Sequence, residues 1–136
     1  MYVRSEAAGE PPQQVRIDKL LDAGVLEEVD LDDDKERELY IEYSMGLDDG
    51  EAMTIALAEN RCLAVATDDK KARRFAQRDG SSVVSVIGTP MLIRHWADVK
   101  RPNVEALRLA INRIEQLARF RPDTADPLRQ WWDSQR

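Results

Sequence analysis

The chain is poor in the residues on which several kinds of catalytic site depend. Its 136 residues contain one cysteine and one histidine. A single cysteine excludes a disulfide framework within the chain, and we expect Cys62, which lies in an apolar run, to be a small core residue rather than a nucleophile. His95 lies beside Trp96 in an apolar segment, where a packing or surface role is expected. Acid-base chemistry would therefore fall to carboxylates or to metal-bound water.

Long apolar runs are missing as well. No stretch approaches the roughly 18 apolar residues that a membrane-spanning helix needs, and the first residues lack the basic-then-apolar order of a signal peptide. We therefore expect a soluble, cytoplasmic protein with no membrane partner. Neither a glycine-rich phosphate loop nor an internal repeat occurs. The length fits one domain, and 43% hydrophobic residues with only 6% aromatic residues predict an aliphatic core.

The net charge of −6 hides a strong asymmetry along the chain. Residues 1–69 hold 19 acidic and 6 basic residues, a net charge of −13, whereas residues 70–136 hold 7 acidic and 14 basic residues, a net charge of +7. Such an asymmetry indicates an acidic centre or partner surface with a basic flank. The basic stretch from Lys70 to Arg78 either binds phosphates or forms a solvated helix face paired with the acidic half, and the sequence leaves both open.

The middle of the chain carries the most informative pattern. Asp48 or Asp49 can cap a helix whose first turn contains Glu51 and whose apolar positions recur at helical spacing. Residues 62–66 form an apolar run without alternation, which predicts a strand buried on both faces. A basic amphipathic helix should follow. The strand is expected to end at Thr67-Asp68-Asp69.

In an open parallel sheet, ligands bind outside the carboxyl ends of the strands, and this is where Asp68 and Asp69 stand. Glu51, from a helix beside the strand, can bring a third carboxylate to the same edge. Crowded carboxylates repel one another unless a cation neutralises them, and hard oxygen ligands suit Mg²⁺ or Mn²⁺ rather than Zn²⁺. A structural role fits the acidic pair equally well, with Asp68 capping the next helix and Asp69 complementing its dipole.

An ordered combination of segments between about residues 46 and 97 carries a family resemblance. Its parts are Gly50-Glu51 opening a helix, Thr67-Asp68-Asp69 closing a strand, Ala72-Arg73 in the next helix, and Gly88-Thr89 after a second strand. In this order they resemble the central and C-terminal part of a PIN domain. PIN domains are a family of metal-dependent nucleases, many of them the ribonuclease toxins of prokaryotic toxin-antitoxin pairs.

Carried over to this sequence, the resemblance implies a site for Mg²⁺ or Mn²⁺, at which the metal would activate water for attack on an RNA phosphodiester and stabilise the leaving oxygen. Three carboxylates would be both catalytic and metal-binding: Glu51, Asp68 and Asp69. Thr67 would support the site by orienting it or a bound water. The residues that would hold the RNA backbone are Lys70, Arg73 and Arg74.

One departure from the family pattern is serious. PIN domains begin with a strand that ends in an essential aspartate, whereas the opening residues Met1 to Glu6 resemble the second strand of the family. The first strand and its catalytic aspartate are therefore expected to be absent, and metal affinity should be poor. Because an unfilled strand position invites pairing, we expect self-association into a homo-oligomer or closure by another segment. The equal alternative is that this chain is a fragment of a longer gene product.

The segments before the central pattern predict two helices. A short strand at Tyr2-Val3 and a boundary at Glu10-Pro11-Pro12 precede a helix over residues 13–23, which should end at Gly24 in the C′ position. Residues 25–29 suggest a weak strand or turn. The triplet Asp32-Asp33-Asp34 is expected to cap a helix through Tyr43 rather than bind Ca²⁺, because it lacks alternating ligands and a glycine turn.

The segments after the central pattern predict a second β-α unit and a helical end. A buried strand over residues 83–87 precedes Gly88-Thr89-Pro90, which signals a helix start. Pro102-Asn103 opens an amphipathic helix that runs to about Phe120. The pair Trp131 and Trp132 is either a latch onto the core or an exposed partner contact, and the latch is favoured. Successive β-α units imply a parallel sheet.

The predicted fold is α/β: a PIN-like three-layer arrangement of a small parallel sheet flanked by helices, N-terminally truncated. We expect one domain over residues 1–136, with a core over residues 1–100 and a helical extension over residues 101–136. The predicted function is a toxin-type ribonuclease with an antitoxin partner, impaired by the missing aspartate. The alternative is a catalytically inactive PIN-like module that binds RNA or a protein. A phospho-acceptor domain is disfavoured, because no candidate acceptor strand precedes the acidic pair.

Overall fold

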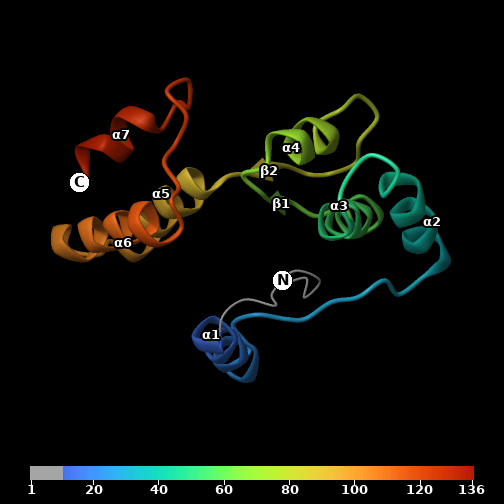
Figure 1. Ribbon diagram of the computed structural model, residues 1–136, viewed down its shortest axis with the longest axis horizontal. Coiled ribbons are helices and arrows are strands. Elements are labelled where there is room, and N and C mark those ends of the chain that lie inside the picture. Colours follow the sequence, from blue (N-terminus) through green and yellow to red (C-terminus); the bar gives the residue numbers. More distant parts are fainter. Residues whose placement is uncertain (1–10) are drawn as a thin grey trace. The chain divides into compact units, whose positions relative to one another are not determined.

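The computed structural model describes residues 11–136 and confirms a mixed α/β fold (Figure 1). Its contacts form two compact units, one ending at Val86 and one running from Ile87 to Arg136. The elements are α1 (Pro11–Asp22), α2 (Asp34–Tyr43), α3 (Asp49–Arg61), β1 (Val65–Ala66), α4 (Lys70–Ala76), β2 (Val86–Ile87), α5 (Thr89–Lys100), α6 (Val104–Leu117) and α7 (Arg129–Ser134). The expected division at residue 100 stays a prediction.

Aspartates set the beginnings of three helices in the first unit. The carboxylate of Asp33 accepts from the Glu36 amide at 2.8 Å, which confirms that the acidic triplet caps α2. Asp48, rather than Asp49, caps α3 by accepting from the Glu51 amide at 2.9 Å. The N-cap of α4 is Asp69. Each cap satisfies an amide that the helix itself leaves unbonded, which stabilises the helix by about 1 kcal/mol.

The sheet is small, open and parallel. It consists of β1 and β2, and the amide of Val65 donates to the Ser85 carbonyl at 2.8 Å while the amide of Val84 donates to the Leu63 carbonyl at 3.0 Å. The expected full burial of both strands is wrong. Val65 is buried but Ala66 is exposed, and both residues of β2 are only half-buried. With two short strands, the sheet offers little surface for helices to cover.

Cys62 lies at the end of α3 and not in the core. It is exposed, and it adopts a left-handed conformation (φ 52°) as the C-cap of the helix. The next amide, that of Leu63, returns to the Ala58 carbonyl at 2.8 Å. The first residues of the predicted strand are therefore used to terminate the helix, which is why β1 starts later than expected.

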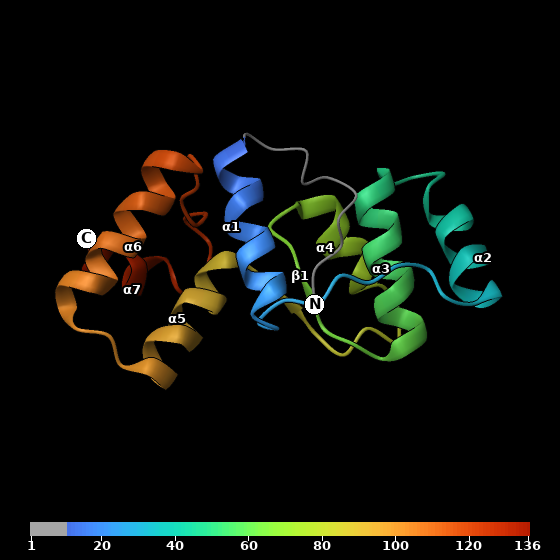
Figure 2. The same cartoon turned by 90° about the horizontal axis from the view of Figure 1, so that it is seen from below.

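The core of the first unit lies between α2, α3 and α4, and α3 stands between α2 and β1 (Figure 2). Tyr43 contributes the largest ring and meets Phe75 edge-to-face at a centroid distance of 4.8 Å. Small residues on α3 and α4 allow close approach of the helices. The buried members are Tyr43, Leu47, Ala52, Ile55, Ala56, Ala72 and Ala76.

The second unit is helical and is closed by the tryptophan pair. Asn103 caps α6, accepting from the Ala106 amide at 2.8 Å, and α6 ends at Leu117, slightly earlier than expected. Trp132 is fully buried against Leu107 and Ile111, and Trp131 packs on the same cluster. The latch favoured from the sequence is therefore present within this unit.

The start of the described chain differs modestly from expectation. α1 begins at Pro11, where a proline is tolerated because the first helical amides are unbonded anyway, and Gly24 follows it with φ 70°, as predicted for its C′ position. The expected strand at Tyr2-Val3 lies outside the described residues. In place of a strand over residues 25–29 there is only an isolated bridge at Glu28. None of the helices in residues 11–136 has the length and apolarity to cross a membrane.

Candidate functional site

Two helix beginnings bring carboxylates together beside the end of β1. Glu51 lies in the first turn of α3, and Asp69 is the residue that caps α4. Burial raises the pKa of Glu51, and the negative charges of Asp48 and Asp69 raise it further, with a hydrogen-bonding contact between the side chains of Glu51 and Asp69. The two side chains are therefore close in space although they are 18 positions apart, and the charge of Asp69 disfavours the ionised form of Glu51.

The two aspartates after β1, Asp68 and Asp69, differ in their surroundings. The Asp69 carboxylate accepts from the Ala72 amide at 2.8 Å, so Asp69, not Asp68, is the cap that a structural role required. The Asp69 amide donates to the Thr67 hydroxyl at 3.2 Å, which fixes the turn between strand and helix. Asp68 is exposed, and its assignment to the site stays a prediction. Capping of α4 explains the position of Asp69 but not its contact with the side chain of Glu51 on α3.

The donor set can be compared with the needs of a divalent cation. In residues 11–136 no group of three or more histidine, cysteine, aspartate or glutamate side chains is arranged to hold a metal. Mg²⁺, however, is commonly bound by one or two carboxylates together with water and substrate phosphates. The pair Glu51 and Asp69 supplies two such carboxylates whose mutual repulsion a cation would relieve. The side chains present thus fit a water-rich site and not a closed cage.

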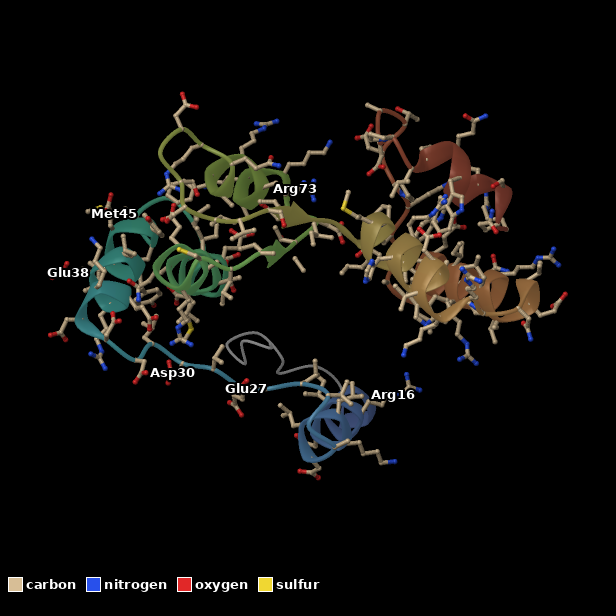
Figure 3. All side chains as sticks on the ribbon, turned by 180° about the vertical axis from the view of Figure 1, so that it is seen from behind. Arg16, Glu27, Asp30, Glu38, Met45 and Arg73 are labelled. Atoms are coloured by element: carbon tan, nitrogen blue, oxygen red, sulfur yellow. The ribbon has the colours of Figure 1, made fainter. Side chains whose placement is uncertain are left out.

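The basic residues of and after α4 have different surroundings. Arg73 projects from α4 beside the strands (Figure 3), and its guanidinium donates to the Thr67 carbonyl at 3.0 Å. Lys70 and Arg74 are exposed on the same helix. Arg78 lies beyond the helix and turns inward, pairing with Glu59 at 3.1 Å and covering the ring of Phe75 at 3.9 Å. Pairing with the acidic half is therefore present at Arg78, whereas phosphate binding by the basic stretch stays a prediction.

A second acidic centre lies at the other end of α3, and no sequence pattern indicated it. Glu59 is buried, and the Tyr43 hydroxyl and the Arg78 guanidinium both donate to its carboxylate. Burial would raise the pKa of Glu59, but these two hydrogen bonds lower it below its ordinary value. Burial and Glu59 also raise the pKa of Tyr43 to about 12. A pocket of about 370 Å³ opens here, with Lys35, Asn60 and Ser82 in its wall.

Tyr40 is a further residue at the N-terminal end of α3 that no sequence pattern indicated. The negative charge of Asp49 raises the pKa of Tyr40, and their side chains are in hydrogen-bonding contact. This contact joins α2 to the first turn of α3, which also carries Glu51. No pattern in the sequence could have located it, because it depends on how the two helices cross.

Comparison with known proteins agrees with the fold. A family model described as a PIN domain matches residues 2–125, a wider range than the motifs between residues 46 and 97 indicated. No curated protein and no solved structure matches the chain. The match covers most of the sequence and includes every carboxylate and basic residue discussed above, and the helix-flanked parallel sheet is consistent with it. The chain belongs to the PIN domain family.

Proposed function

We propose that this protein is a divalent-metal-dependent ribonuclease whose site is formed by Glu51, Asp68 and Asp69. The observation that carries the proposal is the contact between Glu51 and Asp69, which brings carboxylates from two helices together next to a basic helix. PIN domains generally depend on divalent metals and suggest RNA as the substrate. Either Mg²⁺ or Mn²⁺ suits these oxygen ligands.

A bound divalent cation would supply Lewis acidity at the scissile phosphodiester and a water of lowered pKa. Glu51, in the first turn of α3, and Asp69, at the N-cap of α4, would hold the cation. Asp68, exposed on the same turn, would complete the ligands or accept a proton from water. Thr67 keeps this turn in place through its hydroxyl contact with the Asp69 amide.

The flank of the site would bind the RNA backbone. Lys70 and Arg74 present positive charge on the exposed side of α4, and Arg73 adds a third charge with its guanidinium held at the Thr67 carbonyl. Phosphate binding of this kind releases counterions, so affinity should fall as salt rises. From the family alone we further propose a toxin-type activity in the cytoplasm, controlled by an antitoxin protein.

The test is RNA cleavage by Glu51→Gln compared with Glu38→Gln. Glutamine keeps the shape of the side chain at position 51 but removes the charge that would hold the cation, so cleavage should fall by at least about 100-fold. Glu38 is exposed on α2 and is the matched control, so its variant should cleave like the wild type. Cleavage is followed on a labelled RNA with Mg²⁺, with Mn²⁺ and with EDTA. Undiminished cleavage by Glu51→Gln would refute the assignment.

A second candidate is an inactive PIN-like module that binds RNA without cleaving it. The observation in its favour is that no group of three or more candidate ligands occurs in residues 11–136. Such a module would bind RNA in a salt-dependent manner in EDTA and would show no turnover when Mg²⁺ or Mn²⁺ is added. The same assay therefore separates the two candidates.

A further inference from the structure

We propose that Arg73 is a positioning residue, which fixes the turn that carries Asp68 and Asp69 by binding the Thr67 carbonyl. The inference rests on the proposed metal site but concerns this chain's own contacts. The Arg73 guanidinium donates to the Thr67 carbonyl at 3.0 Å, from a half-buried position on α4. Arg74, the next residue, is exposed and makes no such contact among the described residues.

The contact closes a small ring of interactions around the turn. The Asp69 amide donates to the Thr67 hydroxyl at 3.2 Å, the Asp69 carboxylate accepts from the Ala72 amide at 2.8 Å, and the Arg73 amide donates to the Asp69 carbonyl at 2.9 Å. The guanidinium of Arg73 also holds the Thr67 carbonyl. Since β1 ends at Ala66, no ladder bond from the described residues fixes this carbonyl.

The ring matters for the site because it limits how the two aspartates can move. Asp68 and Asp69 both lie between the residues that the Arg73 side chain joins. A ligand carboxylate that is held in place before the cation arrives loses less conformational entropy on binding. Outer contacts of this kind typically change metal affinity by about 10- to 100-fold.

The proposal makes a prediction whose sign is opposite to that of simple electrostatics. A positive charge beside a cation site repels the cation, so removal of an arginine should tighten metal binding if charge alone matters. If Arg73 positions the turn, its removal should weaken metal binding instead. Arg73→Met keeps much of the aliphatic stem and removes both the charge and the donors, and Arg74→Met is the matched control.

The experiment titrates Mn²⁺ into the wild type and the variants by calorimetry and measures ¹⁵N order parameters of the Asp68 and Asp69 amides in the metal-free protein. We expect Arg73→Met to weaken Mn²⁺ binding by about 10-fold and to lower the order parameters from about 0.85 toward 0.6. Arg74→Met should do neither. Arg73→Lys, which keeps the charge and one donor to the carbonyl, should restore much of the affinity.

The outcomes separate this inference from the proposed function. Unchanged or tighter Mn²⁺ binding by Arg73→Met, or an unchanged order of the turn, overturns the positioning role. If the wild type binds no Mn²⁺ at millimolar concentration, the metal site itself fails, and the order parameters alone decide whether Arg73 fixes the turn. Should Arg73→Met not fold, as judged by circular dichroism, Arg73→Gln, whose side chain is too short to reach the Thr67 carbonyl as the guanidinium does, is compared with Arg74→Gln, and equal affinity and equal order in that pair overturn the inference.

Discussion

The two ends of α3 hold their carboxylates in opposite ways. At the C-terminal end, Arg61 pairs with buried Glu36 at 2.7 Å, and Arg78 pairs with buried Glu59 at 3.1 Å. At the N-terminal end, about 12 Å away along the helix, Glu51 faces Asp69, and within the described residues neither has a basic partner. The Arg61 hydrogen bond lowers the pKa of Glu36, and hydrogen bonds from Tyr43 and Arg78 lower that of Glu59 in spite of its burial. Burial and acidic neighbours instead raise the pKa of Glu51.

The difference between the two ends of α3 separates acidic residues that stabilise the fold through arginine pairs from acidic residues that have no basic partner within the described residues. A buried carboxylate is stable when a guanidinium and further donors satisfy it, and Glu36 and Glu59 meet this condition. Carboxylates that crowd together without a basic side chain destabilise the fold, because their charges repel one another. Such destabilising repulsion is present at the N-terminal end of α3 and, among residues 11–136, absent at its C-terminal end. Unpaired, crowded carboxylates of this kind are typical of a functional site.

The largest effect on stability should come from breaking the arginine-paired end. Glu36 is 1% exposed and accepts hydrogen bonds from the Asp32 amide, Asn60 and Arg61. Glu36→Ala would leave these donors unsatisfied, and we expect a loss of about 3 kcal/mol in the free energy of unfolding, since Arg61 is 28% exposed and can be rehydrated in part. Urea denaturation followed by circular dichroism measures it. Glu38→Ala, on the exposed side of α2, should change stability by less than about 0.5 kcal/mol, and an equal effect of both variants would contradict the comparison.

Acid should act on this end of α3 through the same residue. The Arg61 hydrogen bond lowers the pKa of Glu36 from 4.5 to about 2. Because the pKa is lower in the folded state, the stabilisation is present above pH 4.5 and is lost as the pH falls toward 2, and it corresponds to at most about 3 kcal/mol. The free energy of unfolding of the wild type should therefore fall over this window more steeply than that of a Glu36→Gln variant. Parallel pH profiles for the two proteins would show that Glu36 is not the group responsible.

Helix beginnings were the part of the fold that the sequence predicted best. Asp33, Asp48 and Asn103 cap helices as their local patterns indicate, because a cap depends on residues only three positions apart. The strands were predicted as too long and too buried. The length of β1 depends on where α3 stops, and Cys62 is drawn into that helix end instead.

The candidate site was predictable only to the level of its residue types. The sequence indicates Glu51 and Asp69 as partners through a family resemblance, and the structure brings these two together. The sequence could not indicate that Arg78 turns inward to Glu59 while Arg73 binds the Thr67 carbonyl. The two arginines have the same chemistry and lie on one basic stretch. Tertiary packing decides which arginine pairs with a given carboxylate, and no local sequence pattern encodes this pairing.

The smallest expected effect separates the two roles of Asp69 at the other end of the comparison. Asparagine caps helices about as well as aspartate, whereas alanine does not. Asp69→Ala should therefore lower the free energy of unfolding by about 1 kcal/mol through loss of the bond to the Ala72 amide, and Asp69→Asn should leave it within about 0.5 kcal/mol of the wild type, because it keeps the cap and relieves repulsion with Glu51. Both variants should lose Mn²⁺ binding equally, since both remove the charge. If Asp69→Asn retained full Mn²⁺ affinity, Asp69 would be a helix cap alone, and the two ends of α3 would differ in packing but not in function.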